Sequence, residues 1–222
     1  MLPKHDEKLA HIRQLLLSLG DDLILAGEQT LSGITTGDVS RFETVRMTLK
    51  SSGAKGNTID NEIVTSLALF GAEATDLRQL VAYLKITTEF IRVCENFKSL
   101  AKRIAPLIEH KAFFSSAQEY AGHLCKSAIK AVALSVATIK TQDKDEVQNL
   151  YRQVQVEESK TDDLYAILEK NVLTDLSKVS EFSADHMQIL STMRKLERIA
   201  DRAVNIAKLN MFAQVGGPLD VY

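Results

Sequence analysis

The 222-residue chain carries 27 lysines and arginines against 29 aspartates and glutamates, which gives a formal net charge of −2. This near balance argues against nucleic acid as the main partner, because DNA and RNA are bound through a clear excess of positive charge. The two cysteines, Cys94 and Cys125, suggest neither a disulfide framework nor a thiolate zinc site, which fits a cytoplasmic location. The apolar cluster near the N-terminus is too short for a signal peptide or a membrane span. Any membrane link is therefore expected to be peripheral, through a partner.

Few glycines and prolines interrupt the chain, and the apolar residues between them recur at three and four positions. That spacing places them on one face of an α-helix, as for Leu9, Ile12, Leu16, Leu19 and Leu23. In chain order the pattern predicts helices over residues 6–32, 38–70 with an interruption near Gly53, 73–104, 110–140, 143–172 and 179–211. Pro106 is expected to mark a junction between the third and the fourth. The sequence therefore predicts an all-α protein.

The third and the sixth predicted helices match each other when the chain is shifted by 106 residues. Residues 86–102 then lie over 192–208 without a gap, and Arg92, Ala101 and Lys102 fall on identical residues. The apolar register also agrees, with an expected core stripe at Met193, Leu196, Ala200, Ala203 and Ala207 and an equivalent one at Thr87, Phe90, Cys94, Phe97 and Ala101. An offset close to half the chain length indicates two tandem copies of a three-helix unit, residues 1–107 and 108–222.

Two carboxylates on the last predicted helix form the first candidate site. Glu197 and Asp201 are four residues apart, so both side chains should lie on one face of the helix. Like charges at this spacing repel each other by about 0.2–0.5 kcal/mol, so a cation is expected beside them. The cation is either an arginine, through pairs of Arg194 with Glu197 and of Arg198 with Asp201, or a metal ion. The sequence leaves both explanations open.

Further acids could complete an oxygen-ligand cluster if neighbouring helices bring them together. They are Asp162 and Asp163 in the second copy and Asp60, Glu62, Glu89 and Glu95 in the first. Asp162 and Asp163, and likewise Asp60 and Glu62, would equally suit a helix start, where acids complement the helix dipole. Ile91 occupies the place of Glu197 in the first copy, so a cluster there would lack one ligand. Carboxylates alone favour magnesium, manganese, calcium or iron over a metal that prefers thiolates.

Motifs of catalysis are not found in the sequence. It has no glycine-rich phosphate loop, no HExxH and no GxSxG, and its five histidines show no metal-ligand spacing. We therefore do not expect an enzyme.

Two segments of the chain resemble the PhoU family. They are ATDLRQLVAYLKITTEFIRVCEN, residues 74–96, and RKLERIADRAVNIAK, residues 194–208. The stretch LLLSLGDDLILAGEQTL, followed later by TIDNEI, is similar to that family's first helix and its acidic turn. The resemblance spans nearly the whole chain and implies a pair of three-helix bundles related by pseudo-symmetry.

The resemblance also implies a function. Members of this family are non-enzymatic negative regulators of phosphate uptake and of the phosphate-starvation response, linking the ATPase of a phosphate ABC transporter to a sensor histidine kinase. They are cytoplasmic, peripheral to the membrane and commonly homodimeric, so the same is expected here. The alternatives are a carboxylate-based metal-binding helical protein and a helical scaffold that serves a different transporter, such as a sodium–phosphate cotransporter.

Some family members bind multinuclear metal clusters through an E(D)xxxD motif in each copy, which implies iron, zinc, manganese or magnesium here. The second motif is intact as Glu197 and Asp201. The first is degenerate, because Glu89 and Glu95 are retained but Ile91 replaces the leading acid. Any metal is therefore expected to bind the C-terminal half first.

Overall fold

The computed structural model of the chain describes residues 2–70, 74–109, 117–178 and 184–217. Within these ranges it contains helices and short connections but no β-strand. The helices are α1 (Leu2–Thr36), α2 (Ser40–Thr48), α3 (Ser52–Phe70), α4 (Ala74–Glu109), α6 (Gln118–Lys140), α7 (Lys144–Lys178) and α8 (Ala184–Val215). The all-α prediction is confirmed. No helix in the described part of the chain is both long and apolar enough to cross a membrane.

The helices lie where the apolar pattern predicts them. The expected interruption falls between Thr48 and Ser52, just before Gly53. The predicted helix starts at residues 73, 110 and 179 lie outside the described residues. The junction predicted at Pro106 is wrong, because α4 continues through this proline to Glu109. Leu107 and Ile108 are buried, and their packing outweighs the one helical hydrogen bond that a proline removes.

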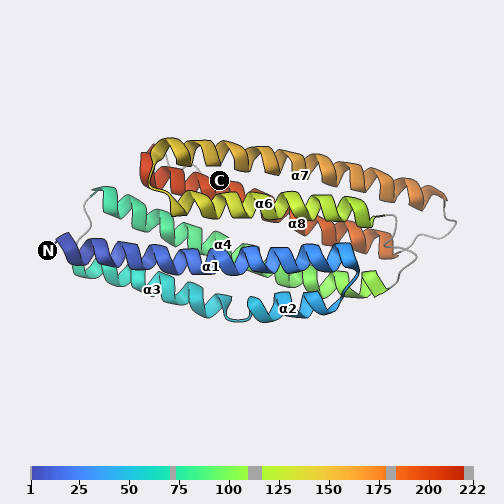
Figure 1. Ribbon diagram of the computed structural model, residues 1–222, viewed down its shortest axis with the longest axis horizontal. Helices are drawn as coiled ribbons and strands as arrows, with labels where there is room; N and C mark the ends of the chain where they lie inside the picture. The colour runs from blue at the N-terminus through green and yellow to red at the C-terminus, as the bar shows by residue number, and fades with distance from the viewer. Residues whose placement is uncertain (1, 71–73, 110–116, 179–183, 218–222) are drawn as a thin grey trace.

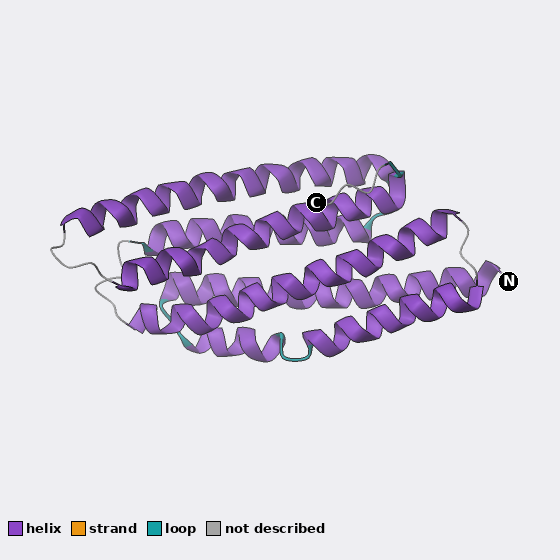
Figure 2. Cartoon of the chain, turned by 180° about the vertical axis from the view of Figure 1, so that it is seen from behind, coloured by secondary structure: helices purple, strands orange, loops and turns teal. Residues whose placement is uncertain are grey.

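Two three-rod bundles lie side by side, one made of α1, α4 and the consecutive pair α2 and α3, the other of α6, α7 and α8 (Figure 1). The break between α2 and α3 lies near the middle of the long axis, whereas the other described connections lie towards its two ends (Figure 2). Helix α1 packs against α6 and α4 packs against α8, so the two bundles share one core. The assignment of residues 1–107 and 108–222 to separate repeats stays a prediction.

The two expected core stripes are buried in the same way. All ten residues of the stripes on α4 and α8 are at most 1% exposed. Each stripe is therefore the inner face of its helix, and the residue that follows a stripe position lies on the flank. The candidate acids of α8 occupy such flank positions.

Two glycines of α1 allow this helix to approach α6 closely. A Cβ atom added at Gly20 would lie 2.8 Å from a methyl carbon of Val136, and one added at Gly27 would lie 2.8 Å from Ile129. The glycines are seven residues apart, so they lie on the same face of α1. Because the chain number rises along α1 as it falls along α6, the two helices are antiparallel.

We predict that Gly20→Ala destabilises the protein although alanine is the better helix former. The helical preference of alanine is worth about 1 kcal/mol. Overpacking of a close contact costs about 1–3 kcal/mol, and the stiff, buried Val136 side chain leaves little room to adjust. A net loss of about 1 kcal/mol in the free energy of unfolding should be measurable by urea denaturation.

Gly53→Ala is the matched control, because an added Cβ there meets no atom within 4 Å. This variant should be slightly more stable than the wild type, by up to about 1 kcal/mol. Equal stability of the two variants would show that α1 and α6 do not make the close contact.

Candidate functional site

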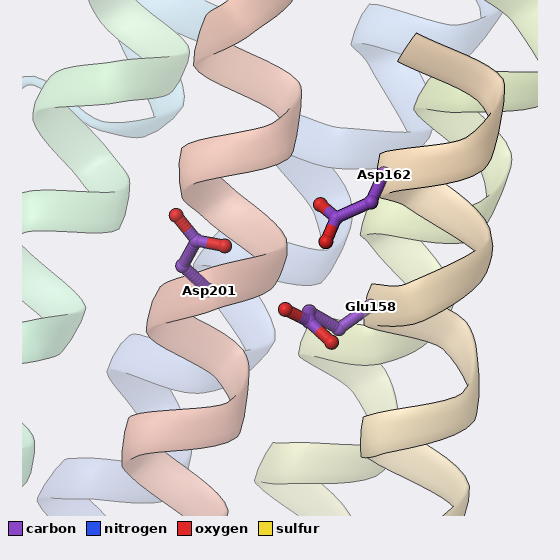
Figure 3. A group of neighbouring side chains, drawn as sticks. All are labelled: Glu158, Asp162 and Asp201. Atoms are coloured by element: carbon purple, nitrogen blue, oxygen red, sulfur yellow. The ribbon is translucent and has the colours of Figure 1, made fainter. Parts of the chain in front are cut away.

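Three carboxylates gather between α7 and α8. Glu158 and Asp162 on α7 and Asp201 on α8 each place an oxygen atom within 4.8 Å of the others. Figure 3 shows both α7 side chains pointing towards α8. Glu158 is half-buried, whereas Asp162 and Asp201 are exposed, so the group opens to solvent.

The register between α7 and α8 explains this meeting. The Cζ atom of Arg194 lies 5.3 Å from the centre of the Tyr165 ring, and this pair fixes which turns face each other. In an antiparallel pair with this register, Glu158 faces the turn of Asp201. Glu158 and Asp162 are four residues apart and therefore share one face of α7.

The structure separates the predicted acids of the second bundle. It brings Asp162 and Asp201 together, and it leaves Asp163 exposed on α7, outside the group. Asp162 lies in the middle of α7, so the alternative of a helix-start acid is wrong. Glu158 was missed by sequence reasoning, although its spacing of four residues from Asp162 was a usable signal.

Glu197 lies one turn from Asp201 and takes part in both explanations that the sequence left open. Its carboxylate pairs with Nε of Arg194 at 3.5 Å, as the arginine explanation predicts. The Oε2 atom that makes this ion pair is buried and forms no hydrogen bond with the described residues. Burial raises the pKa of Glu197, and the charge of Asp201 raises it further against the opposing effect of Arg194.

Burial and neighbouring negative charges also raise the pKa values of Glu158 and Asp201. Burial raises the pKa of Glu158, and the neighbouring charges of Asp162, Asp201 and Glu197 add to the effect. Burial and the Asp162 charge likewise raise the pKa of Asp201. Nearby arginines compensate only part of this repulsion. A cation placed among the carboxylates would therefore be attracted.

Two predicted acids of the first bundle, Glu89 and Glu95, are engaged with basic side chains. Glu89 is buried and accepts hydrogen bonds from Nη1 of Arg92 at 2.8 Å and from Nη1 of Arg202 at 3.1 Å. Glu95 pairs with Lys98 at 2.5 Å. A role for either acid as a metal ligand stays a prediction.

An apolar contact stands in the first bundle where the second has carboxylates. With the shift of 106 residues, Ile91 is the counterpart of Glu197. It packs against Gly56, where an added Cβ atom would lie 2.9 Å from the Cδ1 atom of Ile91. When α3 and α7 are aligned so that their buried positions coincide, Gly56 corresponds to Glu158 and Asp60 corresponds to Asp162. Asp60 keeps a buried oxygen without a hydrogen-bond partner among the described residues, and burial raises its pKa.

We predict that Asp201→Asn stabilises the metal-free protein at neutral pH. A carboxyl group with a raised pKa stabilises the fold while it is protonated, and this contribution is lost as the pH rises from its unfolded pKa, near 4, through its folded pKa. Asp201 keeps contact with solvent, so the expected gain at pH 7 is only about 0.5 kcal/mol. It should vanish below about pH 4. Urea denaturation at both pH values with a chelator present measures it.

Asp163→Asn serves as the control, because Asp163 lies on the same pair of helices but outside the group. This substitution should change stability little at either pH. If both variants gave the same gain, the repulsion would be general rather than local to the three carboxylates.

Comparisons with known proteins match both the fold and the sequence. The PhoU domain model matches residues 122–209, which contain the acids of α7 and α8. The phosphate-specific transport system accessory protein PhoU homolog of Xylella fastidiosa is 25% identical over 213 residues, covering 96% of this chain and 85% of that protein. The homolog from Zymomonas mobilis is 24% identical, covering 95% of this chain and 86% of that protein.

Solved structures agree over almost the whole chain. PhoU from Pseudomonas aeruginosa superposes with a TM-score of 0.86 at 22% identity, covering 96% of this chain and 99% of that one. The phosphate transport system regulatory protein PhoU from Streptococcus pneumoniae gives a TM-score of 0.81 at 19% identity, covering 97% and 99%. The domain match over residues 122–209, the nearly full-length relatives and the shared fold together support the assignment of this chain to the PhoU family.

Proposed function

We propose that this protein regulates phosphate transport by binding other proteins, as an adaptor between a phosphate transporter and its sensor kinase. The observation that carries the proposal is the similarity to phosphate-specific transport accessory proteins over 96% of the chain. Because the likeness includes both bundles, the adaptor role applies to the chain as a whole. The protein acts as a homodimer at the cytoplasmic side of the transporter.

The chemistry of the cysteines supports a non-enzymatic role. Cys94 and Cys125 are both fully buried. Burial raises the pKa of Cys94 to about 12 and raises that of Cys125 as well. Neither thiol is therefore available as a nucleophile at neutral pH.

The carboxylates between α7 and α8 give the regulator a metal-dependent element in our proposal. Glu158, Asp162 and Asp201 supply hard oxygen ligands, and Glu197 lies within one turn of them. A divalent ion would neutralise their repulsion and link two long helices of one bundle. The first bundle lacks the equivalents of Glu158 and Glu197, so we assign one metal site to each chain.

Metal binding should raise the stability of the wild type and fail in Asp201→Asn. At a manganese concentration 100 times the dissociation constant, the free energy of unfolding should increase by about 2.7 kcal/mol. Thermal unfolding with and without Mn²⁺, together with metal analysis of the purified protein, measures the effect. Glu158→Gln should behave like Asp201→Asn.

Glu95→Gln is the control that the repeat provides, because Glu95 corresponds to Asp201 in the first bundle. This variant should keep the metal and the stabilisation. Equal metal content in the wild type, Asp201→Asn and Glu95→Gln would contradict a site between α7 and α8.

Deletion of the gene should release phosphate-responsive genes from repression in phosphate-rich medium and alter phosphate uptake. Affinity capture with the purified chain should retain the transporter ATPase and the sensor kinase. Unchanged uptake and unchanged gene expression in the deletion strain would refute the regulatory role. A change confined to sodium-dependent phosphate uptake would favour the alternative of a sodium–phosphate transporter partner.

A further inference from the structure

A shallow groove of about 680 Å³ runs between α4 and α8, beside the acidic group. Its polar lining consists of Arg92, Glu95 and Asn96 from α4 and Arg198, Asp201 and Arg202 from α8. With the shift of 106 residues, Arg92 corresponds to Arg198, Glu95 to Asp201 and Asn96 to Arg202. The groove therefore lies on the pseudo-twofold axis that relates the bundles, and a ligand centred there would meet side chains from both copies.

A buried carboxylate holds two of the three guanidinium groups in place. Glu89 has a side chain only 8% exposed, and it bridges Arg92 on its own helix and Arg202 on α8. Each arginine uses Nη1 for this contact. A guanidinium has five N–H donors, so each keeps donors for a ligand. The side chains of Arg92 and Arg202 are 54% and 33% exposed, which leaves them accessible.

The side chains that line the groove carry a small positive excess, although Glu89 behind the arginines and the acidic group beside Asp201 add negative charge nearby. Three guanidinium groups line it against two carboxylates, those of Glu95 and Asp201. Glu95 also pairs with Lys98, which adds another positive charge nearby. The positive field extends along α8, since burial and then the charges of Arg103 and Arg198 lower the pKa of Lys195.

We propose that this groove binds hydrogen phosphate, with Arg92, Arg198 and Arg202 donating hydrogen bonds to its oxygens. Guanidinium groups match the oxygens of a tetrahedral anion in geometry and charge. A carboxylate in such a site can only accept a hydrogen bond. Glu95 and Asp201 therefore suit an anion that still carries a proton, and they repel one that carries none. Hydrogen phosphate has such a proton, whereas sulfate does not.

This proposal goes beyond the regulatory role and does not depend on it, because binding of the anion can be measured on the purified chain. A protein that bound phosphate itself would have a direct means of reporting the level of the ion. The groove also shares Asp201 with the acidic group, so the two sites adjoin each other on α8.

The test is calorimetric titration of inorganic phosphate into the chelator-treated protein at constant ionic strength, with sulfate and chloride titrated in parallel. Chelation removes binding through a metal ion. Arg198→Gln and Arg92→Gln should each weaken phosphate binding about tenfold or more, because each removes a charged donor. The wild type should prefer phosphate to sulfate by at least about tenfold.

Arg46→Gln is the matched control, because Arg46 is 55% exposed and pairs with an acid three residues away at 2.9 Å, as Arg92 does, but lies on α2. It should bind phosphate like the wild type. No phosphate binding by the wild type, equal binding by Arg198→Gln, or equal affinity for sulfate would each overturn the proposal. Circular dichroism of every variant ensures that a loss of binding is not a loss of fold.

Discussion

The antiparallel packing of α4 against α8 sets the position of the groove and decides which flank of α8 is left to face α7. Arg78 near the start of α4 donates to the carbonyl of Ala213 near the end of α8 at 3.2 Å, and further along Glu89 meets Arg202. This arrangement brings equivalent residues of the two copies to one axis. It also leaves the outer flanks of both helices facing solvent, where charged side chains keep their hydration. The groove lies on that axis, and the acidic group lies on the flank of α8 towards α7.

Ion pairs of opposite polarity distinguish the two bundles. In the first bundle Asp22 of α1 pairs with Lys55 of α3, and in the second Lys130 of α6 pairs with Glu157 of α7 at 2.6 Å. The acid and the base have exchanged helices. If α3 took the place of α7, Lys55 would face Lys130, and the like charges would repel. This repulsion disfavours a mispaired bundle in which α3 packs in the place of α7.

Among the described residues, the carboxylate group between α7 and α8 has no counterpart at the equivalent positions of the first bundle. Glu158 and Glu197 approach each other in the second bundle, and Gly56 and Ile91 are in contact at the equivalent positions of the first. Ile91 fills the space that a missing side chain at Gly56 leaves. Compared with Glu158 and Glu197, the pair of Gly56 and Ile91 keeps the helices packed, α3 on α4, and carries two fewer negative charges. The first bundle therefore retains its shape without the chemistry of the second.

The sequence by itself determined the helices and the inward faces of α4 and α8, because burial imposes a spacing of three and four residues that each helix displays locally. It also singled out Asp162 and Asp201. It could not select Glu158, exclude Asp163 from the group or show that Glu89 is bound by Arg202, because these facts depend on how two helices are aligned. That alignment comes from side-chain packing between segments distant in the chain, and only the tertiary structure decided it.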